Sequence, residues 1–482
     1  MLLAKTLKVH FVGIGGIGMS GIAEVLLRLG WAVSGSDLRP SPVLERLAAL
    51  GARIDIGHKA HQVGDAGVVV ISSAVSPQNP EVTAARERRI PVIPRAEMLA
   101  ELMRLKFGIA VAGMHGKTTT TSMIATLLAA AQLDPTVVVG GRLDTMGSNA
   151  RLGASEYLVA EADESDRSFL KLSPIIAVIT NLDREHLDCY ADLEDIQRAF
   201  AEFANRVPFY GGVVICTEEE PARALLPLLK RQVLSYGERP EAGVQILDLR
   251  LETRRTRFRL ELSESAAPAL GRASLPRDLG TFELIVPGRH NVLNATAAVT
   301  VGLMLGRDLE VLRTSLAEFH GVDRRFQFKG EVAGVAVIDD YGHHPTEIAA
   351  TIAAARQRSY TRVLMLFQPH RYTRTYHLQE EFAAALRGVD RGFLLDIYSA
   401  GEEPIPGVDS RSLVERLRAS GAAVEYVPSV EEAVARIAQA ARPGDVILTQ
   451  GAGNVSALGD KILQALRGLP DAAQSPAAAQ LA

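Results

Sequence analysis

The chain of 482 residues has few of the features that mark disulfide-rich, membrane-spanning or nucleic-acid-binding proteins. Its two cysteines, Cys189 and Cys216, are too few for a disulfide scaffold and favour a reducing cytoplasm. No apolar run reaches the roughly 18 residues of a transmembrane helix, and residues 1–10 do not resemble a signal peptide because they contain Lys5 and Lys8. A net charge of −4 gives no basic excess for nucleic acid or for a membrane surface. We therefore expect a cytoplasmic protein without nucleic-acid partners or membrane insertion. The sequence does not choose between a monomer and a homodimer.

The chain is long, and strand-like apolar runs alternate with helical patterns along most of it, which predicts α/β domains with parallel sheets. At about 150 residues a domain, we expect three domains, 1–106, 107–321 and 322–471. An alternating pattern at 243–286 predicts an antiparallel insertion, and residues 472–482, rich in Ala, Gln, Ser and Pro, predict a disordered tail. The expected strands are Val9–Val12, Ala32–Ser34, Val68–Ile71, Pro91–Ile93, Phe107–Ala112, Val137–Val139, Tyr157–Ala160, Ile175–Thr180, Val335–Ile338, Val363–Phe367, Phe393–Asp396 and Val446–Leu448.

A glycine loop with a lysine follows the expected strand Phe107–Ala112. The loop reads Gly113-Met114-His115-Gly116-Lys117-Thr118-Thr119-Thr120, and a helix is expected over Thr121–Gln132. Strand, glycine loop, Lys-Thr and helix is the layout of a phosphate-binding loop, in which Lys117 reaches the β- and γ-phosphates and Thr118 ligates Mg²⁺. The general pattern needs glycine where this chain has Val111, so the loop is tighter, and a plain glycine turn stays open as an alternative. The sequence predicts binding of ATP or GTP.

A second glycine loop, Gly13–Gly18, follows the first expected strand and fits G-x-G-x-x-G, with Asp37 closing the next strand. This pattern is typical of dinucleotide binding and by itself favours a nicotinamide or flavin enzyme. The same backbone also holds the diphosphate of a UDP-linked substrate. Ser36 and Asp37 can bond a ribose or a base, and the hydroxyls of Ser72 and Ser73 are expected at the same sheet edge. Two loops predict two nucleotides, ATP at Lys117 and either a nucleotide-linked substrate or a redox cofactor here.

Two polar clusters, Glu161–Asp166 and Asn181–Asp188, follow expected strands of the central domain. Ligands of such sheets bind beyond the carboxyl ends of the strands, so both clusters are expected to face the Lys117 loop. Mg²⁺ prefers oxygen ligands, and we favour Glu161, which is nearest the strand end, over Glu164. His186 can ligate a second cation or orient a carboxylate. The alternative for the acidic residues is a solvated loop.

These motifs and others further along the chain occur in the order found in the Mur ligases. The chain resembles this family over nearly its whole length, and only the tail is excluded. The other segments that carry the resemblance are His290–Asn294, Arg324-Arg325-Phe326, Asp339–Pro345 and Phe367–Thr375. Within the family, Glu161–Asp166, Asp340–Pro345 and Phe367–Thr375 are most similar to the members that add L-alanine to UDP-N-acetylmuramate. The resemblance implies an α/β fold of three domains: a Rossmann-like N-terminal domain for the UDP-sugar, a P-loop ATPase-like central domain and a Rossmann-like C-terminal domain for the amino acid.

The resemblance also implies roles for individual residues. For the UDP-sugar site they are Gly15, Gly16, Ile17, Gly18, Ser36, Asp37, Ser72 and Ser73. For the ATP site they are Gly113, Met114, His115, Gly116, Lys117, Thr118, Thr119, Asn291, Asn294, Arg325 and Asp340. For the amino-acid site they are His344, Arg371 and Arg374, for Mg²⁺ they are Thr118, Glu161 and His186, and the catalytic groups are Lys117, Glu161, His186 and Arg325.

The implied reaction activates a carboxylate with ATP as an acyl phosphate, which the amine of alanine then attacks. Two residues depart from the family pattern, Met114 where threonine is usual and Glu185 where aspartate usually precedes the histidine. His343 or His344 can help to keep the amine neutral. The alternatives are a related ligase that recycles a whole peptide, an NAD-dependent oxidoreductase that uses Gly13–Gly18, and a P-loop switch ATPase.

Overall fold

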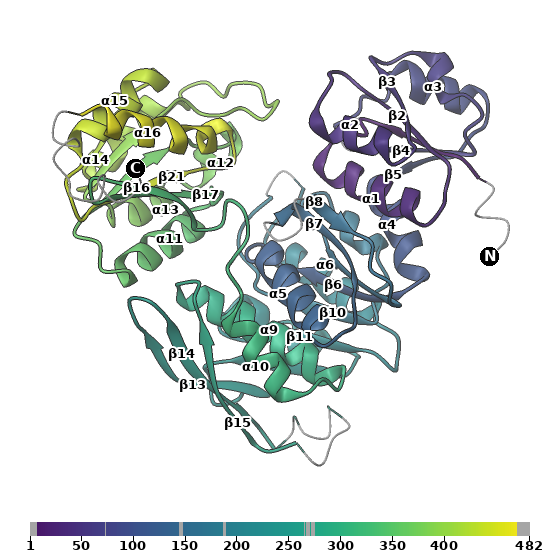
Figure 1. The fold of residues 1–482 in the computed structure, drawn as a ribbon, viewed down its shortest axis with the longest axis horizontal. Coiled ribbons are helices and arrows are strands. Elements are labelled where there is room, and N and C mark those ends of the chain that lie inside the picture. The colour runs from purple at the N-terminus through teal and green to yellow at the C-terminus, as the bar shows by residue number, and fades with distance from the viewer. Residues whose placement is uncertain are drawn as a thin grey trace, which may run out of the picture. The chain divides into compact units, whose positions relative to one another are not determined.

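The computed structural model describes residues 7–72, 74–143, 148–186, 189–264, 266, 270 and 275–469, with the backbone alone for Ile17, 140–143, 148 and 149. The expectations for Ser73 and for the tail 472–482 lie outside these residues. The chain packs into two compact units. Unit 1 comprises residues 1–247, 259–282 and 293–317, and unit 2 comprises residues 248–258, 283–292 and 318–482. The fold is α/β, as the sequence predicts, and Figure 1 gives the labels of its elements.

The N-terminal part of unit 1 is a five-stranded sheet with the order β3-β2-β1-β4-β5, in which every pair is parallel. Its strands are β1 (Val9–Val12), β2 (Val33–Asp37), β3 (Arg53–Ile56), β4 (Val68–Ile71) and β5 (Val92–Pro94). Its helices are α1 (Ile17–Arg28), α2 (Pro42–Ala49), α3 (Pro80–Glu87) and α4 (Arg95–Arg104). The sequence missed β3, because this edge strand is half exposed and carries charge at every second position.

A buried carboxylate holds several elements of this sheet together. Glu81, at the start of α3, is fully buried. One carboxylate oxygen lies 2.6 Å from His10 Nε2 on β1, and the other accepts a hydrogen bond of 2.7 Å from the Ser36 hydroxyl on β2 and lies 2.7 Å from His58 Nδ1. Burial opposes ionisation, but these hydrogen bonds outweigh it and lower the pKa of Glu81.

The rest of unit 1 is built on a sheet with the order β15-β14-β13-β12-β11-β10-β6-β9-β7-β8, whose outer strands reach into residues assigned to unit 2. Its strands are β6 (Phe107–Ala112), β7 (Thr136–Leu143), β8 (Ser148–Arg151), β9 (Tyr157–Glu161), β10 (Ile176–Ile179), β11 (Gly212–Cys216), β12 (Val233–Gly237), β13 (Val244–Leu251), β14 (Thr256–Leu262) and β15 (Asp278–Leu284). β6 lies between β9 and β10 and is parallel to both. The carboxyl ends of β6, β9 and β10 therefore share one edge of the sheet.

The expected antiparallel insertion corresponds to β13, β14 and β15. β13 pairs with β12 in parallel, and residues 252–255 connect it to its neighbour β14. So short a connection joins antiparallel strands. The helices of this part are α5 (Lys117–Ala130), α6 (Leu193–Asn205), α7 (Glu220–Arg223), α9 (Arg289–Met304) and α10 (Leu309–Ala317).

Helix α5 begins four residues earlier than the sequence predicts, at Lys117 and not at Thr121. Threonine is a weak helix former, and the sequence places Thr118, Thr119 and Thr120 in the loop and begins the helix at Thr121. All four threonines are buried, and Gly116 before them is in the left-handed conformation, with φ 81°. Tertiary packing therefore overrides the local propensity and brings the start of the helix up to the lysine.

Unit 2 holds a sheet with the order β16-β17-β21-β18-β19-β20. Its strands are β16 (Gln327–Val332), β17 (Val335–Asp340), β18 (Val363–Phe367), β19 (Arg391–Leu394), β20 (Val424–Tyr426) and β21 (Val446–Gln450). Only the β16–β17 pair is antiparallel among these described strands. Its helices are α11 (Pro345–Gln357), α12 (Tyr372–His377), α13 (Gln379–Leu386), α14 (Ser410–Ala419), α15 (Val430–Ala440) and α16 (Leu458–Arg467).

Both faces of the unit 2 sheet are covered by helices (Figure 1). On β17, Ala336 and Ile338 pack with α11, α13 and α14, whereas Val335 and Val337 pack with α15 and α16. This alternation is that of a strand buried on both sides, which explains the continuous apolar run in the sequence. The expected strand Phe393–Asp396 is shifted by two residues, because the ladder to β18 begins at Arg391.

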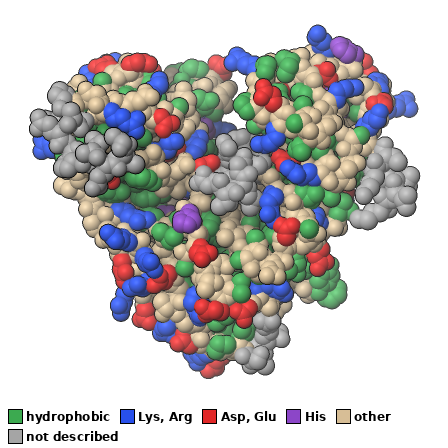
Figure 2. Space-filling view, viewed as in Figure 1, with side chains coloured by type: hydrophobic (Ala, Val, Ile, Leu, Met, Phe, Trp, Pro, Cys, Tyr) green, Lys and Arg blue, Asp and Glu red, His purple; other side chains and the backbone are tan. Residues whose placement is uncertain are grey.

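Basic and acidic side chains are interspersed over the face shown in Figure 2, in keeping with the small net charge. Within the part of the chain that the structure describes, every helix is too short or too polar to cross a membrane.

The buried carboxylate Glu81 gives a prediction about acid stability. Because folding lowers its pKa, its stabilising effect is complete above the ordinary value of 4.5 and is lost as the pH falls below it. Glu81→Ala should lower the free energy of unfolding by about 3 kcal/mol at pH 7, measured by urea denaturation. Glu87→Ala, at the exposed end of the same helix, should change it by less than about 0.5 kcal/mol. Equal losses in the two variants, or a Glu81→Gln variant with an unchanged acid transition, would contradict the assignment.

Candidate active site

The glycine loop between β6 and α5 has a backbone that other residues cannot adopt without strain. Gly113 has a φ of 137° and Gly116 a φ of 81°. A Cβ atom on Gly113 would lie 2.0 Å from Thr180 Oγ1, and one on Gly116 would lie 2.6 Å from Asn294 Oδ1. Both glycines are therefore required by conformation and by space. The second contact also places Asn294, from α9, against the loop.

The residues after β10 fix the shape of this loop. Asn181 Oδ1 accepts a hydrogen bond of 2.9 Å from the His115 backbone N–H. Asn181 Nδ2 and the Thr180 hydroxyl both donate to the His115 carbonyl, at 2.9 and 2.7 Å. The peptide groups of the loop are thus held by side chains of the neighbouring strand. A loop fixed in this way can present its backbone to a phosphate without being reorganised by the ligand.

The side chain of Lys117 is folded back over the loop. Its Nζ donates to the Gly113 carbonyl at 2.7 Å, to the Met114 carbonyl at 3.3 Å and to Glu164 Oε1 at 2.7 Å. Burial disfavours the ammonium, but the charge and hydrogen bond of Glu164 outweigh burial and raise the pKa of Lys117 above its ordinary value. The lysine is therefore a fixed cation at the mouth of the loop.

Glu164, and not Glu161, makes the carboxylate contact with this lysine. Glu164 is almost fully buried, its Oε1 lies 3.4 Å from His186 Nε2, and its backbone carbonyl accepts a hydrogen bond of 2.7 Å from the Tyr190 hydroxyl. Glu161, which the sequence favours as a Mg²⁺ ligand, raises the pKa of Lys117 through its charge. Its role as a metal ligand stays a prediction, whereas the turn after β9 brings Glu164 to the lysine.

The other oxygen of Glu164, Oε2, is buried without a hydrogen-bond partner among the described residues. A buried carboxylate oxygen without a donor is unfavourable unless a cation takes that place. The neighbouring His186 has a φ of 56°, which is rare for a residue with a side chain and is typical of functional sites. A carboxylate oxygen is a ligand that Mg²⁺ prefers, and the sequence adds the expectation of a hydroxyl from Thr118, the residue after Lys117.

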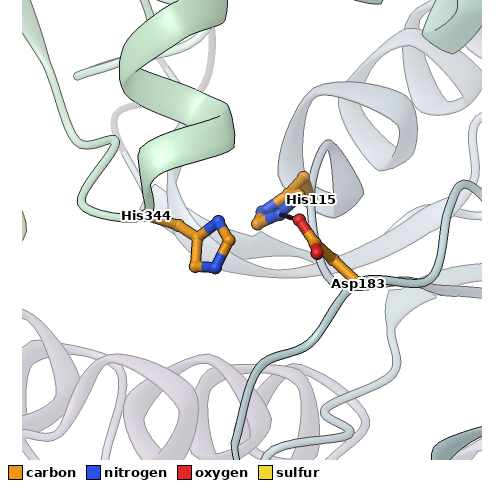
Figure 3. Close-up of side chains that lie close together, drawn as sticks. All are labelled: His115, Asp183 and His344. Carbon is orange, nitrogen blue, oxygen red and sulfur yellow. Dashed lines mark hydrogen bonds and ion pairs between the residues drawn. The ribbon is translucent and has the colours of Figure 1, made fainter. Parts of the chain in front are cut away.

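His115 and Asp183 form a second polar contact beside the loop (Figure 3). His115 Nε2 lies 3.0 Å from Asp183 Oδ2. The third side chain drawn in that figure, His344, caps a helix of unit 2 and is described below. Asp183 was missed as an individual site residue, although it lies within the predicted cluster Asn181–Asp188. Leu187 and Asp188 of that cluster lie outside the described residues.

At the first glycine loop, the structure separates the roles of Ser36 and Asp37. Asp37 Oδ2 accepts a hydrogen bond of 2.8 Å from the Gly15 N–H, so it braces the loop. Ser36 is fully buried and donates to Glu81, so its side chain stabilises the sheet and does not face a ligand, which corrects the sequence-based expectation. Gly16 precedes α1, Ile17 and Gly18 form its first residues, and Ser72 follows β4, as predicted.

In unit 2, Glu347 and Asp340 organise the residues expected to contact ATP. Glu347 accepts hydrogen bonds from the backbone N–H groups of His343 and His344, at 2.9 and 3.2 Å, and from Arg325 Nη1 at 3.3 Å. Asp340 is buried and accepts from the N–H groups of residues 326 and 342, both at 2.8 Å. His344 is the buried N-cap of α11, and its Nδ1 accepts from the residue 346 N–H.

The arginines expected at the amino-acid site lie on or next to α12. Arg371 precedes the helix with a φ of 70°, and its Nη1 lies 3.9 Å from Glu402 Oε1. Arg374 Nη1 donates to the His370 carbonyl at 3.0 Å. The ring of His370 stacks on that of Tyr398, with centroids 5.7 Å apart. The sequence missed Glu402, which lies in a loop without a motif.

Sequence comparison with known families matches all three parts of the chain. Residues 8–107 match "Mur ligase family, catalytic domain", residues 111–302 match "Mur ligase middle domain", and residues 324–453 match "Mur ligase, glutamate ligase domain". The chain belongs to the Mur ligase family. The resemblance noted from the sequence is thereby confirmed.

Individual Mur ligases match over nearly the whole chain. The UDP-N-acetylmuramate--L-alanine ligase of Koribacter versatilis is 56% identical over 96% of this chain and 98% of its own. The crystal structure of UDP-N-acetylmuramate-alanine ligase from Thermotoga maritima has a TM-score of 0.76 and 29% identity, over 95% of this chain and 98% of that one. A UDP-N-acetylmuramate:L-alanyl-gamma-D-glutamyl-meso-diaminopimelate ligase from Neisseria meningitides has a TM-score of 0.58 and 29% identity, over 66% and 99%.

The two departures from the Mur ligase pattern fall on residues with backbone contacts. The Met114 carbonyl accepts a hydrogen bond from Lys117, and the Met114 N–H donates to the Asn181 carbonyl at 3.4 Å, so the loop uses the main chain of this residue. Glu185 is buried, and its N–H donates to the Asp183 carbonyl at 3.0 Å. On α9, Asn291 Nδ2 donates to the Pro287 carbonyl at 2.7 Å, three residues before Asn294.

The tight packing around Gly113 gives a prediction. Gly113→Ala places a methyl group against the Thr180 hydroxyl and strains a left-handed backbone by about 1–3 kcal/mol. The affinity for a fluorescent ATP analogue should therefore fall about tenfold or more. Gly30→Ala is the control, because Gly30 also has a positive φ, of 84°, but has open space around it. The prediction is wrong if both variants bind the analogue like the unmodified protein.

Proposed function

We propose that this Mur ligase joins L-alanine to the carboxylate of UDP-N-acetylmuramate with ATP, through an acyl phosphate, in the synthesis of peptidoglycan precursors. The observation that carries the proposal is the cluster that Lys117 of the glycine loop forms with Glu164 and His186 from the ends of the neighbouring strands. The full-length similarity to UDP-N-acetylmuramate--L-alanine ligases supports the choice of substrates. The Gly13–Gly18 loop then takes the diphosphate of the UDP-sugar, and NAD-dependent chemistry leaves the lysine loop unexplained.

A carboxylate becomes reactive toward an amine only after activation. In the proposed reaction a carboxylate oxygen of the sugar attacks the γ-phosphorus of ATP, and ADP leaves. The enzyme contributes mainly position and charge to such a step. Lys117 offers a fixed positive charge to the phosphates, and the N–H groups at the start of α5 add the positive end of a helix. The amine of alanine then attacks the acyl carbon, and phosphate leaves.

Mur ligases are ATP-dependent, and we propose Mg²⁺ as the accompanying cation. When bound, it neutralises phosphate charge. Thr118, Glu164 and His186 would hold it, since the second oxygen of Glu164 is buried without a donor among the described residues. Glu161, the ligand expected from the sequence, stays a proposal as a further contributor of negative charge.

In unit 2 we assign the carboxylate of alanine to Arg371 or Arg374, since a planar guanidinium suits bidentate pairing. His344 is buried at the start of α11 and is proposed beside the amino acid. Arg325 and Asp340 are proposed to contact ATP. A monomer or homodimer is the expected assembly, which light scattering can decide.

The substrate assignment predicts the outcome of a phosphate-release assay. With ATP, Mg²⁺ and UDP-N-acetylmuramate, L-alanine should stimulate release well above L-serine or glycine, and the tripeptide L-alanyl-γ-D-glutamyl-meso-diaminopimelate should not stimulate it. Stimulation by the tripeptide alone would favour the peptide-recycling ligase. Binding of NAD(H) without binding of UDP, measured by equilibrium titration, would favour an oxidoreductase.

The role of Lys117 is tested by Lys117→Ala. Loss of this fixed charge should lower kcat about 100-fold or more. Binding of UDP-N-acetylmuramate, measured by calorimetry, should be retained, because the two glycine loops lie on different sheets. Lys106→Ala is the matched control, since Lys106 precedes β6 whereas Lys117 follows it, and its turnover should stay within about twofold. Retained turnover in Lys117→Ala would exclude the lysine from phosphoryl transfer.

A further inference from the structure

Arg95 lies between the two glycine loops of unit 1. It is the first residue of α4, directly after β5. A Cβ atom on Gly18 would lie 2.3 Å from Arg95 Nη1 and 3.0 Å from its Cζ. The guanidinium therefore packs directly on the beginning of α1, where a residue larger than glycine would displace the end of the arginine side chain. The last glycine of G-x-G-x-x-G is thus explained here by an arginine side chain, beyond the close packing of helix and strand that this position usually serves.

The other end of the guanidinium pairs with the turn that follows β9. Arg95 Nη2 donates to Asp163 Oδ2 at 2.8 Å. Asp163 Oδ1 accepts from the Ser165 hydroxyl at 2.6 Å and from its N–H at 3.2 Å, and the Asp163 carbonyl accepts from the Phe169 N–H at 3.0 Å. Asp163 is therefore held by its side chain and its main chain at once.

The residue after Asp163 is Glu164, the partner of Lys117. Asp163, which contacts Arg95, and Glu164, which contacts Lys117, are thus neighbours in the chain. Any shift of Asp163 moves Glu164 relative to Lys117, and a displacement of about 1 Å in such a group is enough to lower a rate strongly. Burial raises the pKa of Asp163, but the hydrogen bond from Ser165 and the charges of Arg95 and Lys117 outweigh it, so its pKa is lowered.

A second ion pair joins the same two segments. It therefore allows a test of whether Arg95 positions Glu164 or only attaches α4 to the segment after β9. Lys171 Nζ lies 3.1 Å from Glu97 Oε2, so it also connects α4 with the segment after β9. Its two side chains are 44% and 40% exposed, and the Asp163 side chain is similarly exposed at 41%, so the two pairs differ mainly in the segment they hold. Exposed pairs of this kind contribute little to stability. If Arg95 only attached α4 to its neighbour, loss of either pair would have a similar effect.

We propose that Arg95 is a positioning residue of the ligase reaction. By holding Asp163, Arg95 keeps Glu164 in contact with Lys117. By packing on Gly18, it also connects these residues with the Gly13–Gly18 loop of the five-stranded sheet. The inference rests on the proposed function for its role in turnover. The contacts that carry it belong to unit 1 and do not depend on the identity of the amino acid.

The test measures turnover for Arg95→Ala, Asp163→Asn and the double variant. Each single variant should lower kcat about tenfold, and the double variant should be no slower than the slower single variant, because both remove the same contact. Arg95→Lys should recover part of the loss, since lysine keeps the charge but cannot contact Asp163 and Gly18 together. Lys171→Ala is the matched control and should keep kcat within about twofold.

The affinity for a fluorescent ATP analogue is measured for the same variants without sugar or amino acid. It should fall in Arg95→Ala and in Asp163→Asn and stay unchanged in Lys171→Ala. Equal effects in Arg95→Ala and Lys171→Ala, multiplying effects in the double variant, or a change only in the KM for the UDP-sugar would each overturn the proposal. If the unmodified protein fails to ligate alanine but the affinities follow the expected order, the proposed function fails while the positioning role stands. Thermal unfolding of every variant shows that it is folded.

Discussion

The ion pair between Lys117 and Glu164 is the contact on which the site in unit 1 depends. An ammonium group buried beside a glycine loop would lose its proton, because burial lowers the pKa of a lysine by several units when nothing opposes it. Glu164 reverses the direction of that shift. Glu164 must itself be held in position, so residues further from the loop also matter. Tyr190 anchors its main chain, and the turn that contains it is tied to α4. The charge of Lys117 is therefore kept in place by a series of contacts that reaches as far as α4.

The elements of the fold were largely visible in the sequence, because buried parallel strands are continuous apolar runs. β1, β4, β6 and β18 have the bounds that the sequence predicts. The edge strand β3 and the beginning of α5 were not found, since one is half exposed and the other is a run of threonines that only packing makes helical. The three-domain boundaries stay a prediction beside the two compact units, because a domain defined by its own sheet need not pack as a separate unit.

The positions of the loops were predictable, whereas the use of particular side chains was not. Glycine, lysine and polar clusters at strand ends follow from spacing. The carboxylate that contacts the lysine is decided by the path of the turn after β9, and the sequence did not predict that it is Glu164. Its preference for Glu161 as a Mg²⁺ ligand stays a prediction. Ser36 shows the same limit, because its neighbour Asp37 braces the loop while the serine hydroxyl turns into the sheet toward Glu81. Adjacent residues on a strand point to opposite faces, and a motif does not say which face meets the ligand.

The place of Arg95 against Gly18 has a consequence for the evolution of such chains. The Arg95 side chain occupies the space that a side chain at Gly18 would take, although the two residues are far apart in the sequence. We therefore expect the two positions to be constrained together. A lineage that replaces the arginine by a small residue opens room at the start of α1 and relaxes the demand for glycine there. In a lineage that keeps the arginine, any side chain at this glycine displaces the end of the guanidinium from its contacts. The two positions should therefore vary together among relatives. The G-x-G-x-x-G pattern alone does not include this dependence of its last glycine on Arg95.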